Sequence, residues 1–224
     1  MIVGEAVVTR FKGLIRTAEA KTIARLRDGR SETEPSATDR FLADLERTFE
    51  EEGDSGKLVF RARSLRDRGR NAPENKFGAD FCGVLNVKTR GFGQTKGFLA
   101  QAKIEGASAR VTTRFYGLIG VSFPNQHELE RLKQQASDML RVTPDSFVFI
   151  YSLDGFAVVP ASSVVGFSGE GGLYGKRVAD FFGEYIMCFI GDPRIRAYDD
   201  KTLEDVMKTM DTRTGILFSV KDQS

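Results

Sequence analysis

The sequence contains one histidine, two cysteines and no tryptophan. Two cysteines are too few for a disulfide scaffold or for a zinc site with four thiolate ligands. Any mechanism built on a catalytic histidine would have to use His127, which the local pattern places in the first turn of a helix as a solvated side chain. Whatever chemistry the protein performs is therefore expected to rely on carboxylates and lysines.

Long hydrophobic runs are also missing. No segment approaches the roughly 18–20 consecutive apolar residues that a membrane span needs, and the first residues lack the apolar block and small-residue cleavage site of a signal peptide. Of the 224 residues, 41% are hydrophobic and 29% are charged, a composition typical of folded globular proteins. We expect a cytoplasmic protein without a membrane partner, built as one large domain or as one domain with a small appendage.

Basic charge is concentrated in one part of the chain. Residues 57–103 contain eleven lysines and arginines but only three acidic residues, a net charge of +8 in a chain whose total is +2. Lysine and arginine release counterions from phosphates, so a basic segment in an otherwise acidic protein is typical of a polyanion partner. A solvated pair of basic strands without a ligand is the alternative.

The first half of the chain predicts helices followed by strands. We expect, in order, a strand near 3–9, helices near 17–27 and over 36–51, and strands over 57–65, 79–87 and 98–104. Ser36 and Asp39 have the spacing of a capping box at the start of the second helix. Glycine, asparagine and proline occur at the junctions between the strands, including a glycine- and lysine-rich turn over 88–97, and this favours hairpin loops.

The second half predicts further helices and strands. The expected elements are a helix over 125–141 capped by Asn125, a hairpin within 146–161, a loop-rich segment over 166–177, helices over 176–188 and 202–210, and a strand over 214–220. The Asp154–Gly155 pair is a typical turn of such a hairpin. This order of elements indicates a mixed α/β protein.

Three polar residues are expected to converge on neighbouring strands. Asp80 opens one predicted strand, and Gln101 and Lys103 lie near the end of the next. In an antiparallel pair the end of one strand lies beside the start of its neighbour, and residues two apart share a face. Carboxylate and amide oxygens are ligands for a hard divalent cation, and a lysine beside them can orient water or neutralise a phosphate.

This pattern resembles the signature of the PD-(D/E)XK nuclease superfamily, in which an acidic residue opens one core strand and (D/E)-x-K lies on the adjoining strand. Here Glu74 is followed by Phe-Gly-Ala-Asp-Phe at 77–81 and by Phe-Leu-Ala-Gln-Ala-Lys at 98–103. The glutamine departs from the usual Asp or Glu and is similar to the Gln-x-Lys variant of Mrr-type restriction endonucleases. The resemblance covers residues 34–160 and implies a restriction-endonuclease-like α/β fold, a mixed sheet flanked by helices.

The resemblance divides the chain into three parts. Residues 1–33 would form an N-terminal extension, residues 34–165 the nuclease core, and residues 166–224 a C-terminal α/β extension. The C-terminal part would serve dimerisation or target recognition, or would belong to the same domain as the core.

The resemblance also implies roles for individual residues. Asp80 would ligate Mg²⁺, for which Mn²⁺ can substitute, Gln101 would complete the metal site, and Lys103 would position the attacking water. The superfamily often has another acid at its first core helix, for which Glu34 is a metal-ligand candidate and Glu74 a competing catalytic candidate. The basic residues expected to bind nucleic acid are Arg61, Arg63, Arg66, Arg68, Arg70, Lys88, Arg90 and Lys96.

The function expected from this pattern is a Mg²⁺-dependent endonuclease that hydrolyses phosphodiester bonds in DNA, of restriction or phage-defence type. Because one site cuts one strand, double-strand cleavage would imply a homodimer or a second binding event. Whether the chain acts alone or within a larger defence complex is left open by the sequence. The alternative is a catalytically weakened protein of nuclease fold that binds nucleic acid, or a regulatory protein whose basic segment meets an acidic partner. The replacement of a carboxylate by Gln101 supports the alternative.

Overall fold

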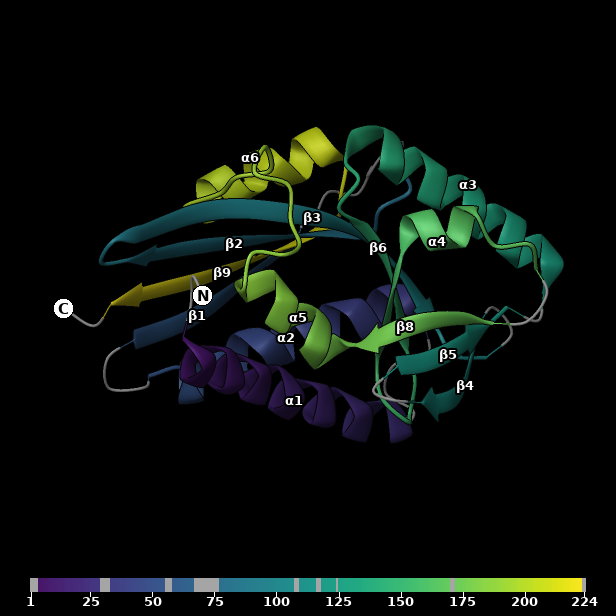
Figure 1. Ribbon diagram of the computed structural model, residues 1–224, viewed down its shortest axis with the longest axis horizontal. Helices are drawn as coiled ribbons and strands as arrows, with labels where there is room; N and C mark the ends of the chain where they lie inside the picture. Colours follow the sequence, from purple (N-terminus) through teal and green to yellow (C-terminus); the bar gives the residue numbers. More distant parts are fainter. Residues whose placement is uncertain are drawn as a thin grey trace.

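In the computed structural model, the strands form one mixed sheet with the order β1-β9-β2-β3-β6-β7-β8-β5-β4 (Figure 1). The structure describes residues 4–28, 33–54, 58–66, 77–106, 109–115, 118–123, 125–169 and 172–222. The strands are β1 (Leu58–Arg66), β2 (Phe81–Thr89), β3 (Phe92–Ile104), β4 (Arg110–Phe115), β5 (Leu118–Ser122), β6 (Ser146–Tyr151), β7 (Ala157–Pro160), β8 (Leu173–Arg177) and β9 (Thr214–Asp222).

Helices flank this sheet on both sides (Figure 1). They are α1 (Glu5–Arg27), α2 (Glu34–Glu52), α3 (Gln126–Val142), α4 (Ala161–Val165), α5 (Val178–Ile186) and α6 (Asp200–Met210). Buried side chains of α1, α2 and α5 share one hydrophobic core with one face of the sheet, and those of α3, α4 and α6 share a second core with the other face. The protein is therefore mixed α/β, as expected. None of the described helices is long and apolar enough to cross a membrane.

The last strand of the chain, β9, lies between β1 and β2. It runs parallel to β2 and antiparallel to β1, so that Ile216 has Gly83 on one side and Ser64 on the other. The expected hairpin between 57–65 and 79–87 is therefore wrong, although both strands form. The segment 166–224, expected as an extension, supplies β8, α5, α6 and β9, and β9 pairs within the sheet that holds β2 and β3.

The strand expected near 3–9 is wrong, because α1 already begins at Glu5. Valine and threonine at 7–9 favour a strand locally. Val8, Phe11 and Ile15, however, follow helical spacing and are buried against α2 and the sheet. The tertiary contacts of this stripe therefore override the local preference.

The start of α2 also differs from the expectation. The capping residue is Thr33, whose side chain accepts a hydrogen bond from the Ser36 backbone, and the Ser36 side chain in turn accepts from the Thr33 backbone. The helix thus begins at Glu34, and the expected box of Ser36 with Asp39 is one turn too late. This shift places the Glu34 carboxylate in the first turn of the helix.

Two segments expected as loops are strands. The pairing of β2 with β3 continues to Thr89 and Phe92, so the predicted turn over 88–97 is reduced to Arg90 and Gly91. Gly91 has a φ of +80°, a conformation that glycine adopts without steric cost. Within the glycine-rich segment over 166–177, residues 173–177 form β8. The helix capped by Asn125, the hairpin of β6 and β7, and the three last predicted elements are confirmed.

The connection from α5 to α6, residues 187–199, crosses from one face of the sheet to the other beside β3. Because β6 pairs with β3 only from Leu99 onward, Gly97 is free to exchange two backbone hydrogen bonds with Asp192. A Cβ atom at Gly97 would lie 2.4 Å from the Ile195 side chain, so only glycine allows this close packing. We call residues 187–199 the crossover segment.

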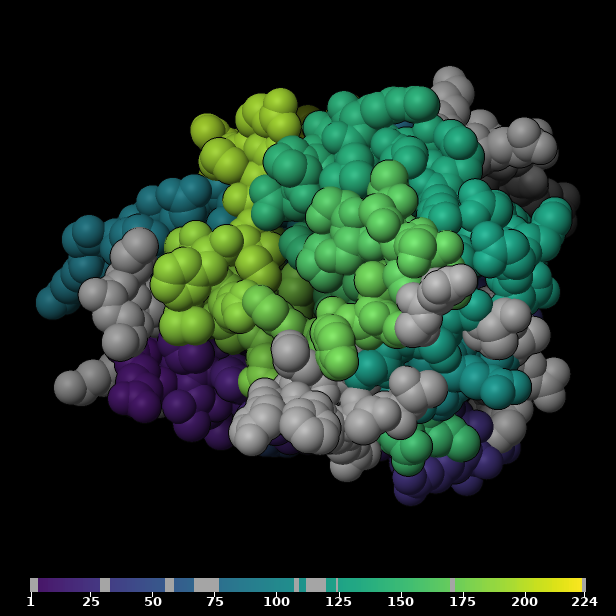
Figure 2. Space-filling view, turned by 45° about the vertical axis from the view of Figure 1, so that its right-hand side comes forward, coloured from purple at the N-terminus to yellow at the C-terminus, as the bar shows by residue number. Residues whose placement is uncertain are grey.

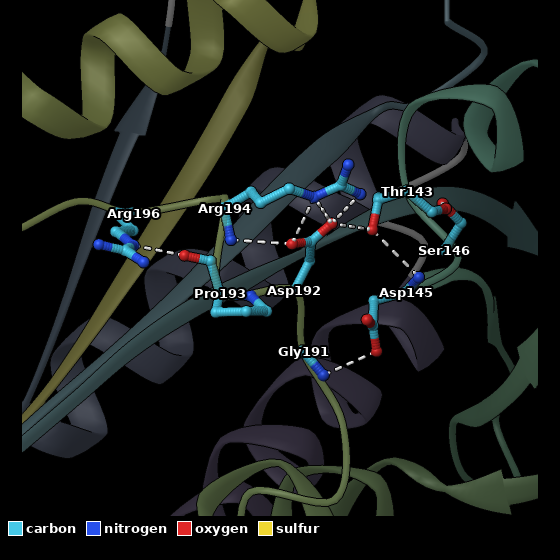
Figure 3. A network of polar contacts seen from close by, with 8 residues as sticks. All are labelled: Thr143, Asp145, Ser146, Gly191, Asp192, Pro193, Arg194 and Arg196. Atoms are coloured by element: carbon cyan, nitrogen blue, oxygen red, sulfur yellow. Dashed lines mark hydrogen bonds and ion pairs between the residues drawn. The ribbon is translucent and has the colours of Figure 1, made fainter.

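A polar network fixes the crossover segment (Figure 3). The Asp192 carboxylate accepts hydrogen bonds from Thr143 Oγ1 at 2.8 Å and from Arg194 Nη2 at 2.6 Å. The Gly191 N–H donates to Asp145 Oδ1 at 2.7 Å. Hydrogen bonds from Arg194 hold the pKa of Asp192 down at about 2. The network therefore ties the crossover segment to the loop between α3 and β6.

Candidate active site

Asp80, Gln101 and Lys103 meet at one end of the sheet, as the sequence predicted. The register pairs Phe81 with Ala100, and the Asp80 N–H donates to the Ala100 carbonyl oxygen at 2.8 Å. Asp80 therefore lies opposite Gln101, and Lys103 follows two residues later on the same face of β3. The antiparallel pair alone is sufficient to bring the three side chains together.

The Asp80 carboxylate is held by two hydrogen bonds to one oxygen. Oδ2 accepts from Gln101 Nε2 at 2.6 Å and from the Ala102 N–H at 2.8 Å. Burial raises the pKa of the Asp80 carboxyl to about 6, and the Ala102 N–H and the Lys103 ammonium offset only part of this effect. A buried carboxyl whose pKa is raised in this way is typical of a functional site.

Gly78 sets the approach of the chain to Asp80. Its φ of +70° lies in the left-handed region, and a Cβ atom there would lie 2.6 Å from the backbone oxygen of Gln135 in α3. Only glycine satisfies both the conformation and the close contact. The turn before β2 is thereby packed against α3, which fixes where Asp80 begins its strand.

The Gln101 side chain is 2% exposed and has one satisfied end and one unsatisfied end. Its Nε2 donates to Asp80 Oδ2 and, at 3.2 Å, to the Ala102 carbonyl oxygen. Since both partners are acceptors, the nitrogen must be the atom that faces them. The opposite atom, Oε1, is buried and has no hydrogen-bond partner within the described residues. A buried acceptor without a donor is costly, which is a reason to look for a missing ligand.

Lys103 forms an ion pair with Glu34. The distance from Nζ to Oε2 is 3.2 Å, and the lysine residue is only 4% exposed. Glu34 is the first residue of α2, where the helix dipole stabilises a negative charge. The structure thus joins a residue from a helix over sixty positions away to the strand pair, and it brings Glu34 to the place expected for the additional acid.

The donor set suits a hard divalent cation. Asp80 and Glu34 contribute carboxylates, and Gln101 contributes the unpartnered Oε1. Mg²⁺ prefers such oxygen ligands and usually keeps several waters. In the part of the chain that the structure describes, no three His, Cys, Asp or Glu side chains gather as a metal site. A cation here would therefore use Gln101 together with the two acids.

The remaining predicted residues fall into three groups. Glu74, Arg68 and Arg70 lie outside the described residues. Lys88 and Arg90 are exposed at the opposite end of β2 from Asp80. Lys96 is 2% exposed, and its Nζ donates to the Ile190 carbonyl oxygen and lies over the Tyr185 ring. Because its ammonium group is enclosed, we leave Lys96 out of the proposed interface with nucleic acid.

The three described arginines of β1 have acidic partners. Their ion pairs are Arg61 with Asp54, Arg63 with Glu46 and Asp200, and Arg66 with Asp39. All three arginine side chains remain about half exposed or more. An exposed ion pair contributes little free energy, so a phosphate can compete for the arginine.

Sequence reasoning included Arg66 but missed three other cations around the site, Arg25, Arg40 and Arg213. Arg25, Arg40 and Arg66 line a pocket of about 410 Å³ next to the start of α2. Arg213, exposed just before β9, is close enough to Asp80 to lower its pKa slightly. These residues come from α1, α2, β1 and the segment before β9, so no local pattern links them. Only the insertion of β9 beside β2 brings Arg213 to this end of the sheet.

No family model, curated protein or solved structure matches this chain.

Proposed function

We propose that the chain is a Mg²⁺-dependent endonuclease that hydrolyses phosphodiester bonds in DNA, with the restriction-endonuclease-like sheet that its motif implies. The observation that carries the proposal is the contact of Asp80 with Gln101 across β2 and β3, with the Lys103–Glu34 pair beside it. Carboxylate and amide oxygens can ligate Mg²⁺, and a lysine beside them can neutralise charge on a phosphate.

Each side chain has a distinct task. Asp80 and Gln101 Oε1 would hold the cation, with Glu34 as an additional ligand directly or through water. Bound Mg²⁺ supplies charge stabilisation at the phosphate and a more acidic water. Lys103, which forms an ion pair with Glu34, would donate a hydrogen bond to the attacking water or to a phosphate oxygen and would there stabilise developing charge.

Cations around the site would bind the phosphates on either side of the cleaved bond. Arg66 and Arg213 lie at the same end of the sheet as Asp80, and Arg40 lines the adjoining pocket. Arginine is suited to phosphate because its planar group can form two parallel hydrogen bonds. A DNA strand across this end of the sheet would place its backbone over Lys103.

A second candidate function is supported by Gln101 itself. Its Nε2 donates to two oxygens, Asp80 Oδ2 and the Ala102 carbonyl, that would otherwise be available to a cation. A site held in this state would bind nucleic acid without cleaving it, in a regulatory or a defence complex. Cleavage assays separate the two functions.

The decisive experiment incubates supercoiled plasmid with the purified chain in EDTA, in Mg²⁺ and in Mn²⁺. We expect nicking or linearisation with either metal and none in EDTA. Lys103→Ala should lower the cleavage rate about 100-fold, as expected for loss of one donor to the transition state, and should change the Kd for DNA by less than about threefold. Lys201→Ala, an exposed lysine of α6, is the matched control. Binding of DNA without cleavage under all conditions would favour the second function.

The oligomeric state follows from the same reasoning. One chain has one such site, so cutting both strands at one position requires two copies. We expect sedimentation to show a dimer when the protein binds a duplex, and a chain that remains monomeric should only nick the plasmid.

A further inference from the structure

A basic groove lies at the end of the sheet opposite the candidate active site. The first half of β9 and β2 is covered by α6, but their last residues project beyond it (Figure 1). Lys88 is eight residues from Asp80 along β2, which corresponds to roughly 26 Å. Figure 2 shows the tip of the hairpin of β2 and β3 standing out from the body of the molecule.

The register of the strands creates the floor of this groove. Lys221 of β9 pairs with Lys88 of β2, and Lys88 pairs with Gly93 of β3. One step inward, Ser219, Asn86 and Thr95 form the neighbouring row on the same face. Gly93 has no side chain, which leaves space above the floor between the two lysines and the crossover segment. The groove has a volume of about 580 Å³.

The crossover segment forms the wall. Arg196 and Tyr198 both line the groove, and both are exposed. Arg196 Nε donates to the Pro193 carbonyl oxygen, within the network of Figure 3. The Tyr198 N–H donates to Thr202 Oγ1 at 2.8 Å, while its side chain is 54% exposed. The Arg196 guanidinium group is therefore held by its own hydrogen bond to Pro193, whereas Tyr198 is fixed through its backbone and its ring stays exposed.

The cations of the groove lack acidic partners within the described residues. Lys88, Lys221 and Arg196 form no salt bridge there, in contrast to the three arginines of β1. The nearest strand-end carboxylate, Asp222, accepts from the Arg90 N–H at 2.5 Å. Like charges on paired strand positions are destabilising. A groove that keeps two of them side by side, with a third opposite, is complementary to an anion.

The polar groups of the floor add a second kind of recognition. Asn86 is 9% exposed, and its Oδ1 accepts from Thr95 Oγ1 at 3.3 Å. Its Nδ2 has no hydrogen-bond partner among the described residues and can donate to a ligand. The exposed ring of Tyr198 provides a surface on which a base can stack.

We propose that this groove binds a nucleotide, with the phosphate between Lys88, Lys221 and Arg196 and the base against Tyr198. The volume fits a ligand of that size. The nucleotide is either free or part of a single strand of nucleic acid, since both present a phosphate beside a base. This site is separate from the proposed nuclease centre and does not depend on it.

The test measures binding to the full chain in EDTA by calorimetry, with pyrophosphate, AMP, ATP and a 12-residue oligodeoxynucleotide as probes. We expect the wild type to bind ATP or the oligonucleotide, and Lys88→Gln/Lys221→Gln to weaken that binding at least tenfold. Tyr198→Ala should weaken binding of ATP or the oligonucleotide but leave pyrophosphate binding unchanged. Arg131→Gln/Lys201→Gln, which removes two exposed positive charges outside the groove, is the matched control.

The outcomes distinguish the sources of the ligand. Binding of ATP supports a free nucleotide, and binding of the oligonucleotide alone supports a strand. The Asp80→Ala protein should bind ATP and the oligonucleotide in the groove as the wild type does. Binding in the groove is therefore tested independently of whether the chain cleaves DNA. Absence of binding by every probe, or equal weakening by the control pair, would overturn the proposal.

Discussion

The two ends of β2 and β3 differ in whether their charged side chains have partners of opposite charge. At the candidate active site, buried Lys103 pairs with Glu34, and the Asp80 carboxylate is bonded to Gln101 and to a backbone N–H. At the other end, Lys88 and Lys221 are neighbours in the sheet without an acidic partner in the described residues. The first site is organised internally before any ligand arrives, whereas the second is incomplete until an anion from outside binds. The following variants test this contrast, from the largest expected effect to the smallest.

Asp80→Asn should separate activity from stability. Burial raises the pKa of the Asp80 carboxyl to about 6, so its ionisation lowers the stability of the folded state, and this cost is complete above about pH 6. We expect the variant to lose cleavage by at least about 100-fold and to gain about 1–3 kcal/mol of unfolding free energy at pH 7.5 in EDTA. Plasmid cleavage and urea denaturation measure the two effects.

The sign of the pH dependence follows from the raised pKa. In the wild type the cost is absent below about pH 4, grows between pH 4 and 6, and is complete above pH 6. Asp80→Asn should abolish this part of the stability profile, and Asp138→Asn, at a partly exposed position of α3, should not. An Asp80→Asn protein that is less stable than the wild type at pH 7.5 would contradict the inference that ionisation of the buried Asp80 carboxyl destabilises the fold.

Gln101→Glu tests whether the candidate active site binds a divalent cation. The new carboxylate would stand where Nε2 now lies 2.6 Å from Asp80 Oδ2, so two like charges would oppose each other. We expect a loss of about 1–3 kcal/mol of unfolding free energy in EDTA. Mg²⁺ should raise the Tm of the variant by more than it raises that of the wild type, and cleavage should be kept or increased.

The control for this variant is Gln126→Glu in the first turn of α3, where a negative charge is tolerated. A folded Gln101→Glu protein with no Mg²⁺ response and no cleavage would reject Gln101 as a metal ligand.

The candidate site was the part of the molecule most accessible to sequence reasoning. Asp80, Gln101 and Lys103 lie within 24 residues on two strands joined by one tight turn, so strand periodicity alone predicts their proximity. Glu34 was expected near this site only through a resemblance, and its ion pair with Lys103 was not predicted. The cations Arg40 and Arg213 lie on elements whose placement depends on β9. No local sequence pattern predicts the order of the strands, so these two residues could not be assigned to the site.

Asp192→Asn should destabilise the crossover segment, which forms the wall of the groove, more than it destabilises the candidate active site. Hydrogen bonds from Arg194 lower the pKa of Asp192 to about 2, so this carboxylate stabilises the fold above about pH 4. The contribution is lost as the pH falls toward 2. Because Arg194 is 71% exposed, we expect a loss of only about 1–2 kcal/mol at pH 7.

Hydrogen exchange should localise the effect of Asp192→Asn to residues 187–199 and the loop before β6. Thermal melts of wild type and variant should converge only as the pH falls to about 2, where the wild-type carboxyl is also losing its charge. Equal protection of the crossover segment in both proteins would show that the network does not hold it.

Lys88→Gln/Lys221→Gln should have the smallest effect on stability, and it should be favourable. Removing two neighbouring like charges relieves roughly 0.2–1 kcal/mol of repulsion. Lys103→Met should instead be destabilising, because it leaves Glu34 without its cation. Denaturation in low salt measures both. A loss of stability in Lys88→Gln/Lys221→Gln would contradict the inference that these two lysines repel each other without an acidic partner.

The basic segment shows where sequence reasoning ended. Charge counting correctly drew attention to residues 57–103, but it treated Lys96 and Lys88 alike, whereas one is enclosed and the other exposed. Arg196, Tyr198 and Lys221 were not considered, because they lie more than 90 residues from that segment. They reach Lys88 only through the crossover segment and β9.

The position of β9 also has a consequence for biosynthesis. While a ribosome is still making the chain, β1 and β2 can both be present, but the strand that joins them has not yet been translated. We expect the nascent protein to keep two unpaired strand edges until residues 214–222 emerge, and such edges are sites of aggregation. Arg213 arrives beside Asp80 at the same moment, so this cation joins the candidate site only after the segment before β9 has been translated. A nascent chain that has not reached residue 213 would thus hold Asp80, Gln101 and Lys103 together on β2 and β3 without this arginine beside them.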